Sequence, residues 1–217
     1  MSAAAQDVTV LQYNTLYTND DIEGIAQEIV NSQAEVVAVH EMTEQRWSEL
    51  APMIAALYPY NVHRLEHGST DVRGFASVLV SRSPLHLVTL DETDAVPVAA
   101  TTTVHGRELL TIALHPSPSR TDATKINQRR DLLESSQRLV AAHDGPAVVI
   151  TDLNIAPTSP DYRDFLVGLG WPDPRRQLGI TPTFPAGSLN PFGIAIDHVF
   201  ASPELQVIDY ELSLIHI

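Results

Sequence analysis

The sequence consists largely of short, apolar, β-prone runs separated by turn-forming residues, and this pattern restricts the fold more than any other feature. Runs of this length, bounded by Gly, Pro and Ser, predict strands, and their close spacing predicts hairpins. Residues 104–108, Val-His-Gly-Arg-Glu, read as one hairpin turn. The predicted strands are residues 8–11, 35–39, 61–65, 75–81, 85–90, 96–104, 109–114, 147–150, 194–201 and 205–211.

Four stretches with helical periodicity interrupt the strands. The first follows Asp20 or Asp21, either of which can cap it, and it places Ile22, Ile25 and Ile29 on one face. The third ends at Asp-Gly-Pro, residues 144–146, which favours a helix stop. Strands, hairpins and helices in this mixture predict an α/β fold, with two sheets packed as a sandwich flanked by helices. The predicted helices are residues 22–31, 44–57, 122–143 and 161–169.

Composition restricts the partners that the chain can have. Its 217 residues, enough for one domain or two small ones, include 13 Lys and Arg against 27 Asp and Glu, a net charge of −14. This charge disfavours nonspecific binding of nucleic acid, although a divalent metal could still recruit a small phosphorylated substrate. The lack of cysteine excludes thiolate metal sites. No apolar run approaches the ~18 residues of a membrane span, and we expect a monomer.

Polar side chains mark the ends of several predicted strands. A charged residue is seldom buried unless it is paired or bound to a metal. A single strand-end acid or amide most often caps a turn, but five such positions on separate strands are better explained by one shared site. Four runs end in Asn14, Glu41, His115 and the pair Asp152 and Asn154, and Asp197 lies inside a fifth.

The chemistry of these side chains is consistent with a metal site. Glu41, Asp152 and Asn154 are hard oxygen ligands of the kind that Mg²⁺ or Mn²⁺ accepts together with water and phosphate oxygens. His115 could protonate a leaving group or stabilise developing charge at phosphorus, and Asp197 could orient an attacking water.

The order and spacing of six segments resemble the endonuclease/exonuclease/phosphatase superfamily. This group includes pancreatic deoxyribonuclease, abasic-site endonucleases, inositol polyphosphate phosphatases and bacterial sphingomyelinases. Each segment is weak alone, but together they extend the resemblance over residues 8–207. The segments are Val-Leu-Gln-Tyr-Asn (10–14), Val-Val-Ala-Val-His-Glu (36–41), Gly-Phe-Ala-Ser-Val-Leu-Val-Ser-Arg (74–82), Val-Val-Ile-Thr-Asp-Leu-Asn (148–154), Thr-Pro-Thr-Phe-Pro (181–185) and Ile-Asp-His-Val-Phe-Ala-Ser (196–202).

The resemblance implies a four-layer α/β/β/α sandwich, with two mixed and mainly antiparallel sheets, that hydrolyses phosphodiesters or phosphomonoesters with Mg²⁺ or Mn²⁺. It also implies a role for each matching residue. Glu41 resembles the principal metal ligand, and Asn14 resembles the amide that supports the metal or the phosphate. Asp152 and Asn154 resemble the pair that positions the nucleophilic water and binds phosphate, with Asp152 also at the metal. His115 resembles the acid or phosphate ligand, and Asp197 resembles the acid before the last strands.

Two departures from the family pattern lie beside these residues. His40 stands where Gln is usual, and Thr151 stands where Gly is usual. We expect His40 to be a structural strand-end histidine, with a role as ligand or supporting donor as the alternative.

A third departure concerns the final Ser-Asp-His element of the family, which supplies a metal-site Asp and the His of the general base and does not occur in the sequence. We expect residues 1–211 to be an incomplete domain without its last strand, and 212–217 to be a non-native tail. The chain as written should then be weakly active or inactive. Relatives of this type often carry membrane helices before the domain, so Met1 could also be an internal start within a longer protein.

Two other functions stay open at this point. The chain could be a non-catalytic module that binds a phosphate ligand on the same fold. It could also be a different metallohydrolase that uses His40, His115 and Asp152 and prefers Zn²⁺, since imidazole suits zinc.

Overall fold

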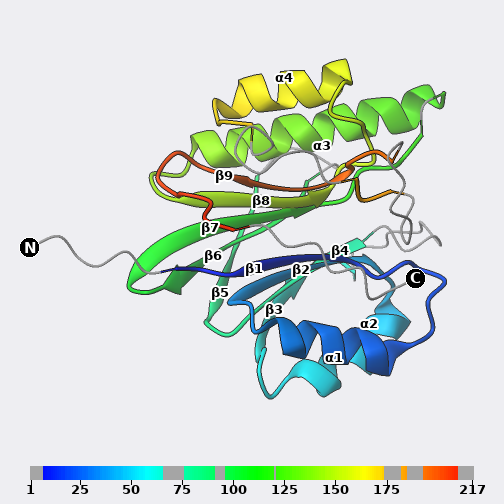
Figure 1. Ribbon diagram of the computed structural model, residues 1–217, viewed down its shortest axis with the longest axis vertical. Helices are drawn as coiled ribbons and strands as arrows, with labels where there is room; N and C mark the ends of the chain where they lie inside the picture. Colours follow the sequence, from blue (N-terminus) through cyan, green and yellow to red (C-terminus); the bar gives the residue numbers. More distant parts are fainter. Residues whose placement is uncertain are drawn as a thin grey trace, which may run out of the picture.

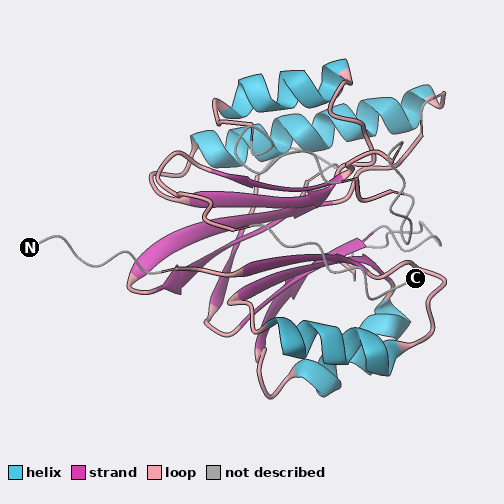
Figure 2. Ribbon diagram, in the orientation of Figure 1, coloured by secondary structure: helices cyan, strands magenta, loops and turns pink. Residues whose placement is uncertain are grey.

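The computed structural model describes residues 7–65, 76–90, 96–119, 121–173, 182–184 and 193–209. Two β-sheets lie face to face in the middle of the molecule (Figure 1). Helices α1 and α2 cover the outer face of one sheet, and α3 and α4 cover the outer face of the other (Figure 2). This α/β/β/α order confirms the predicted fold class.

The first sheet has the strand order β1-β2-β4-β3. Its strands β1 and β2 are parallel, and the other pairs are antiparallel. All seven residues of β2 are buried, and the first four, residues 36–39, are the continuous apolar run of the sequence. The strands are β1 (Val10–Asn14), β2 (Val36–Met42), β3 (Tyr60–His63) and β4 (Ala76–Ser81).

The second sheet has the strand order β5-β6-β7-β8-β9. Only β7 and β8 are parallel in it, so both sheets are mixed and mainly antiparallel, as predicted. The strands are β5 (Leu85–Val88), β6 (Val98–Val104), β7 (Arg107–Leu114), β8 (Ala147–Asp152) and β9 (Asp197–Ala201).

Each helix begins where a capping signal stands. The side chain of Asp21 accepts the Gly24 N–H at 2.9 Å, and Thr43 and Asp122 cap their helices in the same way. The fourth helix begins with a proline and ends at Gly170, which has a left-handed backbone. The helices are α1 (Ile22–Ser32), α2 (Glu44–Ile54), α3 (Ala123–Ala141) and α4 (Pro160–Leu169).

Three apolar layers hold the sandwich together. One lies between the first sheet and α1 and α2, around Ile25 and Leu50, and another lies between the second sheet and α3 and α4, around Phe165. The middle layer joins the two sheets and includes Leu79 and Ile150. Because the sheets are packed through this layer, their polar ends are held at a fixed separation.

Two strand predictions near the end of the described chain are wrong. Residues 205–209 form no strand, because the chain turns directly after β9 with Leu205 N–H bonded to Ser202 O at 2.9 Å. The predicted strand 194–201 is also too long, since Ile194 makes only an isolated bridge and Asp197 opens β9 rather than lying inside a strand.

Several sequence expectations fall outside the described residues. They concern residues 74–75, most of the segment 181–185, and residues 210–217. The missing last strand, the incomplete domain 1–211 and the non-native tail 212–217 therefore stay predictions. Among the helices of the described residues, none is long and apolar enough to cross a membrane.

Candidate active site

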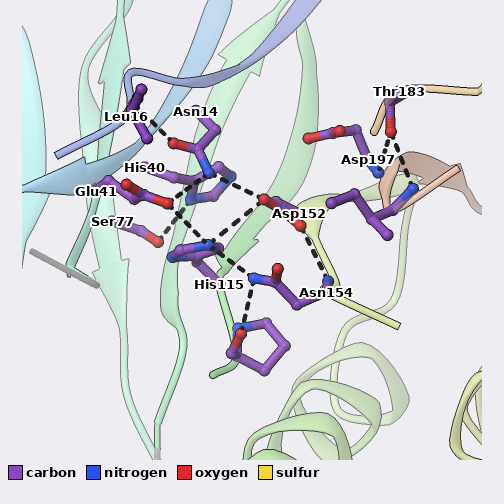
Figure 3. A network of polar contacts seen from close by, with 12 residues as sticks. Asn14, Leu16, His40, Glu41, Ser77, His115, Asp152, Asn154, Thr183 and Asp197 are labelled. Atoms are coloured by element: carbon purple, nitrogen blue, oxygen red, sulfur yellow. Dashed lines mark hydrogen bonds and ion pairs between the residues drawn. The ribbon is translucent and has the colours of Figure 1, made fainter. Parts of the chain in front are cut away.

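Strand topology gathers the six predicted site residues at one edge of the two sheets. In the first sheet, β1 and β2 are parallel and Asn14 pairs with His40, next to Glu41. In the second sheet, β7 and β8 are parallel and end together. Because β9 is antiparallel to β8, its first residue Asp197 lies opposite Asp152, at the end of β8. Figure 3 shows the resulting cluster.

The amide of Asn14 joins the two sheets at the centre of this cluster. Its Nδ2 donates to Glu41 Oε1 at 2.8 Å and to Asp152 Oδ2 at 2.9 Å (Figure 3). Its Oδ1 accepts the Leu16 N–H at 2.9 Å, which fixes the orientation of the amide. The two carboxylates therefore converge on one point, although they come from different sheets.

A bulge in β2 directs Glu41 into the site. The register between β2 and β4 shifts between Val39 and Met42, and Glu41 has a left-handed backbone with φ of 61°. Successive side chains of a regular strand point to opposite faces. Here His40 stacks on the His115 ring at 5.5 Å, and Glu41 Oε1 lies 3.7 Å from His115 Nε2. The Tyr17 N–H donates to Glu41 Oε2 at 2.7 Å.

His115 and Asn154 form the second-sheet side of the site. His115 is buried directly after β7, and its Nε2 lies 3.0 Å from Asn154 Nδ2 and 3.5 Å from Asp152 Oδ2. Asn154 Nδ2 also donates to Pro116 O at 3.1 Å. A neutral His115 can accept from Asn154 at Nε2, whereas a protonated His115 can pair with Asp152. The imidazole thus has a partner in either proton state.

The acids Asp152 and Asp197 have pKa values displaced in opposite directions. Burial alone would raise the pKa of Asp152, but the hydrogen bond and charge of His115, with further bonds from Asn14 and Asn154, hold it below its usual value. Burial, followed by the charge of Asp152, raises the pKa of Asp197 to about 7. Gln12 Nε2 donates to Asp197 Oδ1 at 2.9 Å and opposes part of this rise. A like-charged pair of this kind separates the two titrations.

His40 is buried behind the site rather than in it. Its Nδ1 lies 2.8 Å from Ser77 Oγ, and its Nε2 has no hydrogen-bond partner among the described residues. Burial, and then the charge of His115, lower the pKa of His40 to about 3, so the ring is neutral at physiological pH. These contacts are consistent with the structural role that we expected for His40.

The donor set at the centre of the site suits Mg²⁺ or Mn²⁺. Glu41 and Asp152 are hard oxygen donors that converge within hydrogen-bond reach of one amide, and the described residues place no Lys or Arg side chain in a salt bridge with either. Within the described part of the chain, no three His, Asp or Glu side chains are placed to enclose a metal by themselves. Mg²⁺ is commonly held by one or two carboxylates together with water and substrate phosphates, so the residues present fit such an ion.

Four residues that contact the site were assigned no role from the sequence. Gln12, Ser77 and Thr183 belong to segments of the family pattern, and Thr183 Oγ1 accepts the Asp197 N–H at 3.2 Å. The positions of these three residues within the family segments could have indicated that they contact the site. Arg46 lies outside every such segment, and nothing in the sequence distinguishes it from a solvent-exposed helix residue.

The four layers and the polar cluster define an α/β sandwich domain with an acidic, amide-rich site where its two sheets end. A match to the Endonuclease/Exonuclease/phosphatase family covers residues 11–215, and the chain belongs to that family. None of the curated protein sequences matches the chain.

Solved structures with the same fold have low sequence identity to the chain. An endonuclease/exonuclease/phosphatase from Beutenbergia cavernae is 21% identical, with a TM-score of 0.71, over 96% of this chain and 67% of that one. Sphingomyelinase C from Streptomyces griseocarneus is 15% identical, with a TM-score of 0.67, over 94% and 86%. A Staphylococcus aureus beta toxin variant with bound magnesium ions is 14% identical, with a TM-score of 0.67, over 93% and 86%.

Proposed function

We propose that the chain is a divalent-metal-dependent phosphoesterase that hydrolyses phosphodiester or phosphomonoester bonds by in-line attack of water. The observation that carries this proposal is the convergence of the Glu41 and Asp152 carboxylates on the Asn14 amide, beside the His115 imidazole. Membership of the family supports hydrolysis of a phosphate ester. The magnesium bound to the Staphylococcus aureus beta toxin variant supports Mg²⁺ as the ion.

The proposed metal site uses residues from both sheets. Glu41 and Asp152 would hold the ion, with Asn14 beside them. A bound divalent cation would supply positive charge beside the phosphoryl oxygens. The side chains of the described site provide little positive charge of their own. The Asn14 amide donates to both carboxylates, so the arrangement of these two ligands is already fixed before an ion binds.

The remaining residues would handle water and protons. Asp152 and Asn154 would orient the attacking water, together with Asp197 opposite Asp152. His115 and Asn154 would bind phosphoryl oxygens from neighbouring positions, Asn154 through its amide N–H and His115 through Nε2 when that nitrogen carries a proton. When it is protonated at Nε2, His115 would pass that proton to the leaving oxygen, since Nε2 lies in the site, 3.5 Å from Asp152 Oδ2 and 3.7 Å from Glu41 Oε1.

Charge narrows the substrate class. The chain has a net charge of −14, and the buried arginines Arg46 and Arg129 are bonded within the protein. Long polyanions are therefore poor substrates. Among the structural neighbours are a sphingomyelinase C and a mannosyl-6-phosphatase, so a substrate panel begins with sphingomyelin and a sugar phosphate.

Hydrolysis of bis-p-nitrophenyl phosphate tests the proposal. We expect turnover that requires Mg²⁺, stops with EDTA and falls to background in Glu41→Gln, because this change removes the charged ligand and keeps the side-chain shape. Glu44→Gln is the matched control, since Glu44 is exposed on α2 three residues away and should retain wild-type activity. Equal rates of hydrolysis by the wild type and Glu41→Gln would contradict the proposal.

We also expect slow turnover, because the Ser-Asp-His element is not found in the sequence and a general base contributes ~10²–10⁴-fold. Calorimetric Mg²⁺ binding should therefore be measured beside activity. Binding without turnover at any protein concentration would favour the alternative function, a phosphate-ligand module without catalysis. Higher activity with Zn²⁺ than with Mg²⁺ would instead favour a hydrolase based on His40, His115 and Asp152.

A further inference from the structure

Arg46 is a buried arginine whose guanidinium binds backbone carbonyls instead of an acid. Its Nη1 donates to Glu41 O at 2.7 Å, and its Nη2 donates to Asn19 O at 3.0 Å and lies 3.5 Å from Thr15 O. The residue is 8% exposed, and its Nε has no hydrogen-bond partner among the described residues. Burial of a charged group is unfavourable, and here the backbone carbonyls and the nearby charges of Glu41 and Asp20 offset that cost.

The carbonyls that Arg46 binds belong to the two loops that build the proposed metal site. One loop follows β1 and runs from Thr15 to Asn19, directly after Asn14. The other is the bulge of β2, which carries Glu41. The two loops also touch each other, because the Tyr17 N–H donates to the Glu41 carboxylate at 2.7 Å. Arg46 therefore fixes the backbones of both loops while Tyr17 fixes the side chain between them.

Both loops contain a residue with a left-handed backbone that is not glycine. Leu16 has a φ of 52°, and Glu41 has a φ of 61°. Residues with a Cβ rarely adopt such angles, and they persist only when surrounding contacts enforce them. The Leu16 backbone lies between two of the carbonyls bound by Arg46, and Glu41 supplies the third. The guanidinium is thus placed to enforce both conformations at once.

Arg129 is a buried arginine with a structural role, and it serves as a comparison for Arg46. It is 7% exposed, almost the same as Arg46. Its guanidinium pairs with Asp161 on α4 at 2.8 Å and bonds Ser119 O at 2.9 Å, so its charge is neutralised and it joins two helices. Arg46 has no comparable ion pair among the described residues, and its hydrogen bonds go to backbone carbonyls of the loop after β1 and of the β2 bulge.

We propose that Arg46 is a positioning residue that preorganises Glu41 and the Asn14 loop for the divalent cation. This inference rests on the proposed function, because it requires Glu41 to be a metal ligand. A planar guanidinium can hold three carbonyls in one arrangement, which a single ammonium cannot reproduce. Removal of Arg46 should therefore relax the bulge and weaken the metal site without unfolding the sandwich.

Mg²⁺ affinity, measured by calorimetry on the full chain, tests the inference independently of turnover. We expect Arg46→Met to bind Mg²⁺ about 10–100-fold more weakly, the usual range for residues that orient metal ligands. Arg46→Lys should bind Mg²⁺ with intermediate affinity, because lysine keeps the positive charge but lacks the planar guanidinium that contacts several carbonyls at once. Arg129→Met is the matched control, and it should bind Mg²⁺ like the wild type while losing thermal stability.

The outcomes separate this inference from the proposed function. If neither the wild type nor Glu41→Gln binds Mg²⁺, the proposed function fails and this inference fails with it. If the wild type binds, Glu41→Gln does not, and both Arg46 variants bind like the wild type, only this inference is overturned. Should Arg46→Met not fold, Arg46→Lys decides alone, since wild-type affinity in that variant is also incompatible with the proposal.

Discussion

The local environments of Asp152 and Asp197 displace the pKa values of these two acids in opposite directions. The two residues pair across β8 and β9, and hydrogen bonds from His115, Asn14 and Asn154 favour the charged form of Asp152. Burial and the charge of Asp152 instead raise the pKa of Asp197 to about 7. Near neutral pH and without a cation, Asp152 is ionised while Asp197 is close to half protonated.

This difference predicts a pH-dependent stability that Asp197→Asn removes. An unfolded Asp ionises near pH 3.9, whereas native Asp197 does so near 7, so the native state binds the extra proton between these values. Wild-type stability should therefore fall relative to Asp197→Asn as pH rises from about 4 to 7, by about 2–4 kcal/mol in total.

Urea unfolding in EDTA across this pH range measures the effect. The wild type must be compared with the variant, because the lowered pKa of His40 acts with the opposite sign: the unfolded state binds the additional proton between about pH 3 and the usual value of 6.5. Parallel stability curves for wild type and Asp197→Asn would contradict the prediction.

At the scale of elements, the β6–β7 hairpin is the turn that the sequence specifies most completely. His105 has a φ of 50° and Gly106 a φ of 76°, so both central residues are left-handed, as a two-residue hairpin turn requires. Gly106 allows this conformation without strain. The turn sets the register of seven cross-strand pairs, from Val98 with Ala113 to Val104 with Arg107.

Gly106→Ala should lower the free energy of unfolding by about 1 kcal/mol. A Cβ at Gly106 would meet no atom within 4 Å, so the loss comes from the backbone conformation and not from a clash. Urea denaturation measures it, with His105→Asn as the paired variant, because Asn tolerates a left-handed backbone better than His. The prediction fails if Gly106→Ala is as stable as the wild type, or if both variants are destabilised equally.

On the scale of the whole molecule, net charge governs which partners can approach. The chain carries 27 acidic residues against 13 basic ones, and Arg46 and Arg129, the buried arginines of the described residues, are bonded within the protein. A surface of this kind repels nucleic acid at distances up to the Debye length, about 10 Å at 0.1 M salt. A bound divalent cation would reverse the sign of the potential only locally.

We therefore expect no nonspecific binding of duplex DNA. Fluorescence anisotropy with a labelled duplex at about 50 mM salt should show no affinity tighter than about 10⁻⁴ M, even though low salt favours such contacts. A measurable affinity that falls steeply with added salt would show that the acidic chain has a basic surface which its net charge conceals.

The six candidate site residues, and the order of helices and strands up to β9, could be predicted from the sequence. Apolar runs, turn residues and helix caps act over a few neighbouring residues, so they can be recognised locally. The candidate site residues stood out because five of them follow apolar runs and Asp197 is a charged residue inside another. Weak local signals account for the error at 205–209, where an alternating run has no described partner strand to pair with.

How these residues meet depends on the packing of the two sheets. Asn14 and Asp152 are 138 positions apart and meet because two sheets pack face to face. The bulge that turns Glu41 inward, and the burial of Arg46 beneath it, depend on contacts between loops of different strands. Long-range contacts of this kind can enforce a left-handed backbone on Leu16 and Glu41 that neither residue favours by itself. Sequence patterns report local preferences, and here the packing overrides them.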